Sequence, residues 1–297
     1  MKALSLRIKE ISEKAPLYTM LIPSLILYFI FFLYPVINAF WLSFFKWAGI
    51  SPYKEFIGID NYIFLTRSSE FYRAFVNTLI ITFLYCLIQS TLGFVMAWLI
   101  RKYGKVGSLL LSIALLPIIL SYVSIGVMWS WIYDPSIGLL NTILKSLKLE
   151  FLIRKWLADP SIALYSILLT TLWGGVGLYT VIYFAGLRTI PNSVYDALEI
   201  DGLSGFQKTR YVVLPLLKDA ILLVLVLASS HAFRIFDVVW VLTGGGPAFS
   251  TETLALHLYR QAFEKWQAGY ACAVGVFLFV ISVILAIIQF KLLSKKK

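Results

Sequence analysis

Six long apolar runs constrain the fold of this chain more than any other feature. They lie near Leu17–Phe45, Phe75–Ile100, Ser108–Tyr133, Ile162–Leu187, Ala220–Leu242 and Gly269–Leu293. Each supplies the roughly 20 residues that an α-helix needs to cross the hydrocarbon core of a bilayer. Only 14% of the residues are charged, against roughly 25% in soluble domains, which excludes a soluble fold. The runs predict an all-α, polytopic membrane protein with six transmembrane helices.

Lys and Arg residues predict the orientation of these helices. They concentrate in the N-terminal tail, the loop Arg101–Lys105, the loop Pro191–Pro215 with its flanks, and the C-terminal tail. These four regions hold 15 of the 26 basic residues and 6 of the 15 acidic residues. Because basic residues are enriched in cytoplasmic loops, both termini are predicted to be cytoplasmic in a multi-pass cell (inner) membrane protein. The net charge of +11 therefore reflects topology, and nucleic acid is not an expected partner.

The first apolar run is longer than the h-region of a signal peptide and lacks a small-residue cleavage site, so it predicts a retained first span. Cys86 and Cys272 both lie within apolar runs. We interpret them as packing residues rather than a disulfide pair or metal ligands.

The polar loop Pro191–Pro215 has the pattern of a helix, a glycine turn and a second helix. Ser193 followed by Asp196 has the spacing of a helix N-cap with an acid in the first turn. Gly202 fits the left-handed position that ends a helix, and Ser204 with Gln207 repeats the capping arrangement. Such an exposed helical loop between two spans suits contact with another protein.

The first of these helices is predicted to have a small apolar face. Val194, Ala197 and Leu198 fall at i, i+3 and i+4. Acidic residues accompany this face, namely Asp196, Glu199 and Asp201. A face of this kind suits a groove on a partner.

Catalytic motifs are not found in the sequence. There is no G-x-x-x-x-G-K-[ST] phosphate-binding loop, and Thr243–Pro247 lacks the Lys and the following helix that a phosphate cradle needs. Only two histidines are present, His231 and His257, too few and too widely spaced to predict a metal site or a catalytic triad. If the chain uses ATP, another subunit must hydrolyse it.

The polar loop resembles a known motif. Its key positions are Asp196-Ala197-Leu198, then Gly202 after three residues, Val212 after nine more, and Leu214-Pro215 after one more. This spacing matches the EAA-x3-G-x9-I-x-LP pattern of binding-protein-dependent ABC importer permeases. Three positions depart from it, with Asp for Glu, Leu for the second Ala and Val for Ile. The segments Gly186–Pro191 and Leu242–Pro247 resemble the carbohydrate, maltose-type branch, and the resemblance runs from about Pro16 to the C-terminus.

The resemblance implies a type I ABC importer permease architecture. Residues 1–74 would form the N-terminal cytoplasmic tail, the first transmembrane helix and the first extracytoplasmic loop, and residues 75–297 the permease core with the coupling loop 191–215. Implied partners are a second, different permease subunit, two cytoplasmic ABC ATPase subunits and an extracytoplasmic solute-binding protein. No cofactor or metal is expected in this chain, whereas ATP and Mg are expected in the ATPase. The implied ATPase-coupling residues are Asp196, Ala197, Leu198, Asp201, Gly202, Leu214 and Pro215.

Polar residues within the predicted fifth span point to a substrate path. His231, Arg234 and Asp237 should face a protein interior or an aqueous cavity, because exposing ionisable groups to lipid costs several kcal/mol. Arg234 and Asp237 are three residues apart, so they either form a structural ion pair or contact a ligand.

In the fourth span, Gly174, Gly175 and Gly177 let either another helix or a ligand approach the backbone. The family resemblance implies that the third to fifth spans line a small sugar site near mid-membrane. The resulting substrate-site candidates are Ser121, Tyr122, Thr171, Trp173, Gly175, Ser230, His231, Arg234 and Asp237.

The favoured function is that of a membrane-spanning subunit of an ATP-driven importer that translocates a sugar or oligosaccharide by alternating access. Two alternatives remain open. One keeps the architecture but moves polyamines, phosphate or another solute. The other is a stand-alone secondary transporter, which should show paired broken helices and midplane ion-coupling residues in both halves. Membrane localisation that depends on partner subunits would separate the importers from the secondary transporter.

Overall fold

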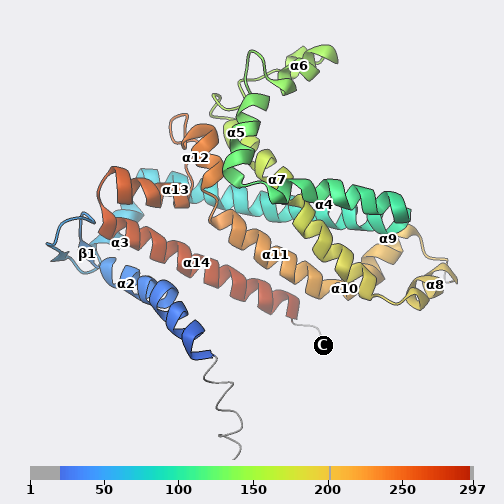
Figure 1. The fold of residues 1–297 in the computed structure, drawn as a ribbon, viewed down its shortest axis with the longest axis horizontal. Helices are drawn as coiled ribbons and strands as arrows, with labels where there is room; N and C mark the ends of the chain where they lie inside the picture. The colour runs from blue at the N-terminus through green and yellow to red at the C-terminus, as the bar shows by residue number, and fades with distance from the viewer. Residues whose placement is uncertain (1–20, 201, 295–297) are drawn as a thin grey trace, which may run out of the picture. The chain divides into compact units, whose positions relative to one another are not determined.

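The structure is a computed structural model that describes residues 21–200 and 202–294, and its described part is predominantly helical (Figure 1). The chain divides into two compact units. One contains residues 1–65 and 261–276, and the other contains residues 66–260 and 277–297.

Four described helices are long and apolar enough to cross a membrane: Leu21–Leu42, Ser69–Gly104, Ala163–Thr189 and Ala268–Leu292. Two further candidates are bent pairs. Val106–Ile119 joins Tyr122–Ile132 at 102°, and Gly205–Leu216 joins Lys218–Phe233 at 74°. If each bent pair is counted as one span, the number of spans agrees with the six predicted. The second pair begins at Gly205, within the polar loop, so its bounds differ from those of the predicted fifth span.

The first unit contains a helical segment, a short hairpin, most of one further helix and the start of another. Its elements are η1 (Phe29–Leu33), α2 (Tyr34–Leu42), β1 (Phe45–Lys46), β2 (Glu55–Phe56), the start of α3 (Asp60–Arg67), most of η5 (Arg260–Glu264) and the start of α14 (Ala268–Ser294). The amide of Asn61 donates to the carbonyls of Ser43 (2.8 Å) and Phe45 (3.0 Å), which fixes α3 to the hairpin. The Gly269 N–H donates to the Trp47 carbonyl at 3.0 Å. These bonds hold the hairpin, α3 and the start of α14 together.

The second unit is organised around three helices, α4 (Ser69–Leu115), α7 (Ala163–Thr189) and α11 (Lys218–Phe233), which pack along one another (Figure 1). Their shared apolar core includes Ile81, Ile167 and Val224. The long α4 contains a sharp reversal at Gly104, whose φ of +53° lies in the left-handed region that favours glycine. This turn separates the second predicted span from the third.

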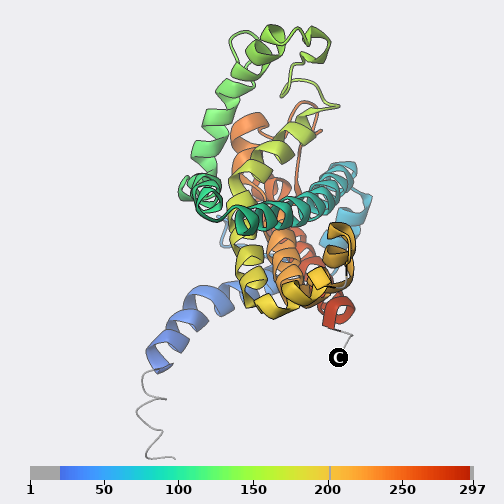
Figure 2. The ribbon, with the colours of Figure 1, turned by 90° about the vertical axis from the view of Figure 1, so that its right-hand side faces the viewer.

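The third predicted span is not straight. A 3₁₀ turn, η2 (Leu116–Ile119), contains Pro117 and precedes α5 (Tyr122–Ile132), which turns away from the end of α4 (Figure 2). Beyond α5 lie α6 (Leu139–Ser146) and η3 (Glu150–Leu152). Proline lacks the N–H that continues a helix, so a break here has a local cause.

The fifth predicted span, Ala220–Leu242, is wrong as a continuous helix. Helix α11 ends at Phe233, and α12 (Asp237–Thr243) starts a new helix after three non-helical residues. The hydroxyl of Thr253, which precedes α13 (Leu254–Tyr259), donates to the Ile235 carbonyl at 3.0 Å. A distant side chain thus satisfies a backbone group that the break frees, which hydropathy alone does not reveal.

Candidate functional sites

The polar loop forms the predicted helix, glycine turn and helix. Helix α8 (Asn192–Ile200) is followed by Gly202 with φ +65°, and then by α9 (Gly205–Lys208), η4 (Thr209–Val213) and α10 (Leu214–Leu216). The capping box is complete, because the Gln207 N–H donates to the Ser204 hydroxyl and the Ser204 N–H donates to the Gln207 side chain. Since α8 begins at Asn192, Ser193 lies in its first turn and not at the predicted N-cap position.

The apolar face predicted for α8 is turned inward. Leu198 is only 6% exposed, and Val194 packs against the protein's own core. Ala197 and Asp196 are exposed, and Ile200, which the predicted face omitted, is 86% exposed. A partner would therefore meet the opposite face of α8, because Val194 and Leu198 already pack against this chain's own core. Of the other predicted coupling residues, Leu214 is half-buried, Pro215 is exposed and Asp201 lies outside the described residues.

Arg101 joins α8 to two membrane helices. It lies near the turn of α4, and its guanidinium donates to the Leu187 carbonyl of α7 at 2.6 Å, to the Tyr195 hydroxyl and to the Asn192 side chain at 3.4 Å. The same guanidinium stacks 3.7 Å from the centre of the Tyr195 ring. Burial raises the pKa of the Tyr195 phenol, while the adjacent Arg101 charge acts in the opposite direction. One cation of α4 thus links α7 and α8.

If the polar loop couples to an ATPase as the resemblance implies, we expect Arg101→Ala to lower transport while ATPase activity of the assembled importer persists. The substitution removes the three hydrogen bonds and the ring contact, so movement of α8 should no longer be passed on to α4 and α7. Lys retains the charge but not the flat fork of donors, so Arg101→Lys should be intermediate. The neighbouring Lys102→Ala is the control. Uptake per ATP hydrolysed in proteoliposomes is the measurement, and an unchanged ratio in Arg101→Ala would contradict this role.

A cluster of aromatic and polar side chains lies between the helices of the second unit. The His231 ring of α11 is 4.9 Å from the Tyr122 ring of α5 and 5.4 Å from the Tyr85 ring of α4. Gly175 of α7 completes the cluster, since a β-carbon there would lie 2.4 Å from the Tyr85 hydroxyl and 2.8 Å from Nε2 of Gln89. The structure thus brings together three predicted candidates, Tyr122, Gly175 and His231.

Several buried polar atoms of this cluster have no hydrogen-bond partner among the described residues. They are Oη of Tyr85, Oε1 of Gln89 and Nε2 of His231. Nε2 of Gln89 does have one, since it donates to the Leu172 carbonyl at 2.9 Å. An unsatisfied buried polar group costs about 1–3 kcal/mol, so these atoms need polar partners, which either ordered water or a ligand can supply. Sequence reasoning missed Tyr85 and Gln89, although a Gln inside an apolar run is a signal of this kind.

The other predicted substrate residues have different surroundings. Thr171 donates its hydroxyl to the Ile167 carbonyl of its own helix at 2.8 Å. Ser121 caps α5 by accepting from the Ser124 N–H at 3.1 Å. Trp173 packs edge-on against Trp129, with ring centres 5.9 Å apart. Thr171 and Ser121 therefore use their hydroxyls locally.

Arg234 and Asp237 do not form the ion pair that their spacing allowed. The Arg234 guanidinium donates instead to the carbonyl (3.0 Å) and hydroxyl (3.3 Å) of Ser230. The helix breaks between Arg234 and Asp237, so the i, i+3 relation no longer places them on one face. Both are exposed in this chain.

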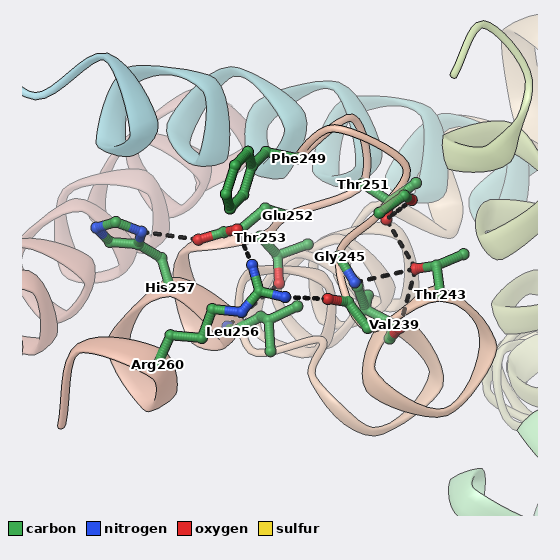
Figure 3. A network of polar contacts seen from close by, with 12 residues as sticks. Val239, Thr243, Gly245, Phe249, Thr251, Glu252, Thr253, Leu256, His257 and Arg260 are labelled. Atoms are coloured by element: carbon green, nitrogen blue, oxygen red, sulfur yellow. Dashed lines mark hydrogen bonds and ion pairs between the residues drawn. The ribbon is translucent and has the colours of Figure 1, made fainter. Parts of the chain in front are cut away.

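The glycine-rich loop after α12 is held by a buried charged network (Figure 3). Glu252 accepts from Arg260 at 2.5 Å, and its other oxygen lies 2.8 Å from Nδ1 of His257. Arg260 also donates to the Gly244 carbonyl, and the hydroxyls of Thr243 and Thr251 are 2.7 Å apart. The sequence showed a family resemblance in this loop but did not predict the network, because partners spread along the chain give no local pattern. Within the described residues, no group of three His, Cys, Asp or Glu side chains could hold a metal ion.

Helices long enough to span a membrane, a helical loop beside them and a polar cluster between them are the features of a membrane transport subunit. Residues 89–297 match the family described as binding-protein-dependent transport system inner membrane component. The chain belongs to this family and is a membrane permease subunit rather than an enzyme.

Named relatives cover almost the whole chain. It is 30% identical to the multiple sugar-binding transport system permease protein MsmF of Streptococcus mutans, over 97% of this chain and 98% of that protein. It is also 30% identical to the trehalose/maltose transport system permease protein MalF of Thermococcus litoralis, over 92% of each. A solved bacterial alginate ABC transporter, in complex with an alginate pentasaccharide-bound periplasmic protein, shares the fold with a TM-score of 0.82 at 24% identity, over 95% of this chain and 94% of that chain.

Proposed function

We propose that this permease subunit translocates a sugar or oligosaccharide by alternating access. The observation that carries the proposal is the buried cluster of Tyr85, Gln89, Tyr122 and His231, in which aromatic rings flank polar atoms that lack partners. Ring faces pack against the C–H surfaces of a sugar, and the unpaired nitrogen and oxygen atoms can bond its hydroxyls. The names of the relatives MsmF and MalF support this cargo class.

The proposed assembly contains a second, different permease subunit, two ATPase subunits that bind ATP with Mg, and an extracytoplasmic solute-binding protein. Both termini and the α8–α9 segment are on the cytoplasmic side, as the distribution of Lys and Arg predicts. ATPase closure then moves α8, and α4 and α7 follow through Arg101. The runner-up cargo is a non-sugar solute such as a polyamine or phosphate.

The test uses Gly175→Ala. The added methyl group would collide with the Tyr85 hydroxyl and the Gln89 amide, so we expect sugar uptake to fall by about tenfold, which corresponds to about 1.4 kcal/mol. Thr171→Val, one turn earlier on α7, is the matched control, because the Thr171 hydroxyl bonds only its own helix. Uptake of labelled maltose, trehalose, spermidine and phosphate is measured in proteoliposomes containing the whole importer.

Two results would contradict the proposal. Equal uptake by Gly175→Ala and the parent would remove the cluster from the substrate path. Uptake of spermidine or phosphate, with none of either sugar, would establish the non-sugar alternative.

A further inference from the structure

A second candidate site lies in the first unit. A pocket of about 740 Å³ is lined by the β1–β2 hairpin, by α3 and by the segment that leads into α14. This volume is within the range of small-molecule sites, roughly 300–1,000 Å³. In the proposed orientation it opens on the extracytoplasmic side.

The lining combines aromatic rings with polar groups. Trp47, Tyr53, Phe64 and Trp266 contribute rings. Between them are charged and amide side chains that form no hydrogen bond or ion pair with another described residue, namely Lys46, Glu55, Asp60 and Gln267. These groups supply both donors and acceptors.

The backbone at Trp266 is unusual. Its φ of +53° lies in the left-handed region, where a bulky residue is an outlier. Such strain persists only where the surrounding structure imposes it, and it is concentrated at functional sites. Here it accompanies a half-exposed indole on the pocket wall.

The charges of the pocket favour a neutral ligand over a cation. Lys46 lines the same pocket as the acids Glu55 and Asp60, and Lys54 places its ammonium 4.6 Å from the centre of the Trp47 ring. The charges of Lys46 and Lys54 therefore balance those of Glu55 and Asp60. The Lys54 ammonium also already lies over one face of the Trp47 ring. A hydroxyl both donates and accepts, so a polyhydroxylated molecule matches this lining.

We propose that this pocket is a saccharide-binding site on the extracytoplasmic side, separate from the buried cluster. Its ligand class rests on the proposed function, but the site itself does not depend on the cluster. Trp266 and Tyr53 supply ring faces, while Glu55, Asp60 and Gln267 bond hydroxyl groups.

The experiment labels the assembled importer, in nanodiscs without ATP, with 5-fluorotryptophan and follows the ¹⁹F resonances during titration with maltose, trehalose or spermidine. We expect saturable shifts of the Trp47 and Trp266 resonances with at least one sugar and none with spermidine. In Trp266→Gly, the shift of the Trp47 resonance should require about tenfold more sugar. Glycine accepts φ +53°, so this variant removes the ring without straining the backbone.

Control variants separate this site from the buried cluster. Ile50→Ala, in the same hairpin but outside the pocket lining, should behave as the parent does. Gly175→Ala should keep the Trp266 response while sugar uptake falls by about tenfold. Absence of a saturable shift with either sugar, an unchanged Trp47 titration in Trp266→Gly, or a response to spermidine instead would each overturn the pocket proposal. If the parent importer takes up sugar but the pocket resonances do not respond, only the pocket proposal is overturned. If the pocket resonances respond but no sugar is taken up, the proposed cargo is overturned.

Discussion

Replacing Gly202 by proline should abolish ATP-driven uptake while leaving the amount of protein in the membrane unchanged. The turn between α8 and α9 needs φ +65° at this residue, and proline holds φ near −65°. Proline also lacks the N–H that Gly202 donates to the Glu199 carbonyl at 3.2 Å. The substitution therefore misplaces α8 relative to α9 without touching a membrane helix.

Alanine variants test the need for a left-handed backbone at Gly202 separately from the other effects of proline. A residue with a β-carbon in the left-handed region costs roughly 1–2 kcal/mol, so Gly202→Ala should lower uptake severalfold. Gly205→Ala is the matched control, because neither glycine has a neighbouring atom near its would-be β-carbon but only Gly202 has positive φ. Membrane content, co-purification of the ATPase and uptake in vesicles are measured. Normal uptake by Gly202→Pro would refute the coupling role of this segment.

Glu252→Ala should lower the stability of the second unit by about 3–5 kcal/mol, the usual result of removing one partner from a buried ion pair. Its carboxylate is almost fully buried and lies against both Arg260 and His257 (Figure 3). The loss would also release Arg260, and with it the loop whose Gly244 carbonyl it bonds. Thermal unfolding of the purified complex should shift down by roughly 10 °C.

Glu252→Gln and Glu199→Ala are the comparisons for this prediction. Glutamine keeps the shape and one acceptor, so we expect an intermediate midpoint. Glu199 is exposed on α8, and its removal should leave the midpoint within about 1 °C, as is usual for surface substitutions. If Glu252→Ala unfolds at the parent temperature, the network is not a source of stability.

Features with a local cause could be predicted well from the sequence. Helices of spanning length follow from hydropathy, because only a helix satisfies its own backbone in lipid. The Gly202 turn and the Ser204–Gln207 capping box follow from contacts within a few residues. The family pattern in the same loop predicted a permease subunit, and the family match confirms it.

Contacts between distant segments were not predictable in this way. The apolar positions Val194 and Leu198 were recognised, but not that this chain's own core covers them. Hydropathy indicates which side chains are buried, but it does not show which segment they pack against. For the same reason, the break after Phe233 and the separation of Arg234 from Asp237 could not be foreseen.

By itself, the sequence determined the helical class, the presence of several membrane-spanning helices and the glycine turn after α8, because hydropathy and short-range hydrogen bonds govern all three. Only the tertiary structure decided the partners of Arg101 on α7 and α8, the meeting of Tyr85 and Gln89 with His231, and the pocket that Trp47 and Trp266 share. Each of these depends on helix packing or chain reversal that brings together residues far apart in sequence. The hydrophobic pattern of a single segment does not encode contacts with distant segments.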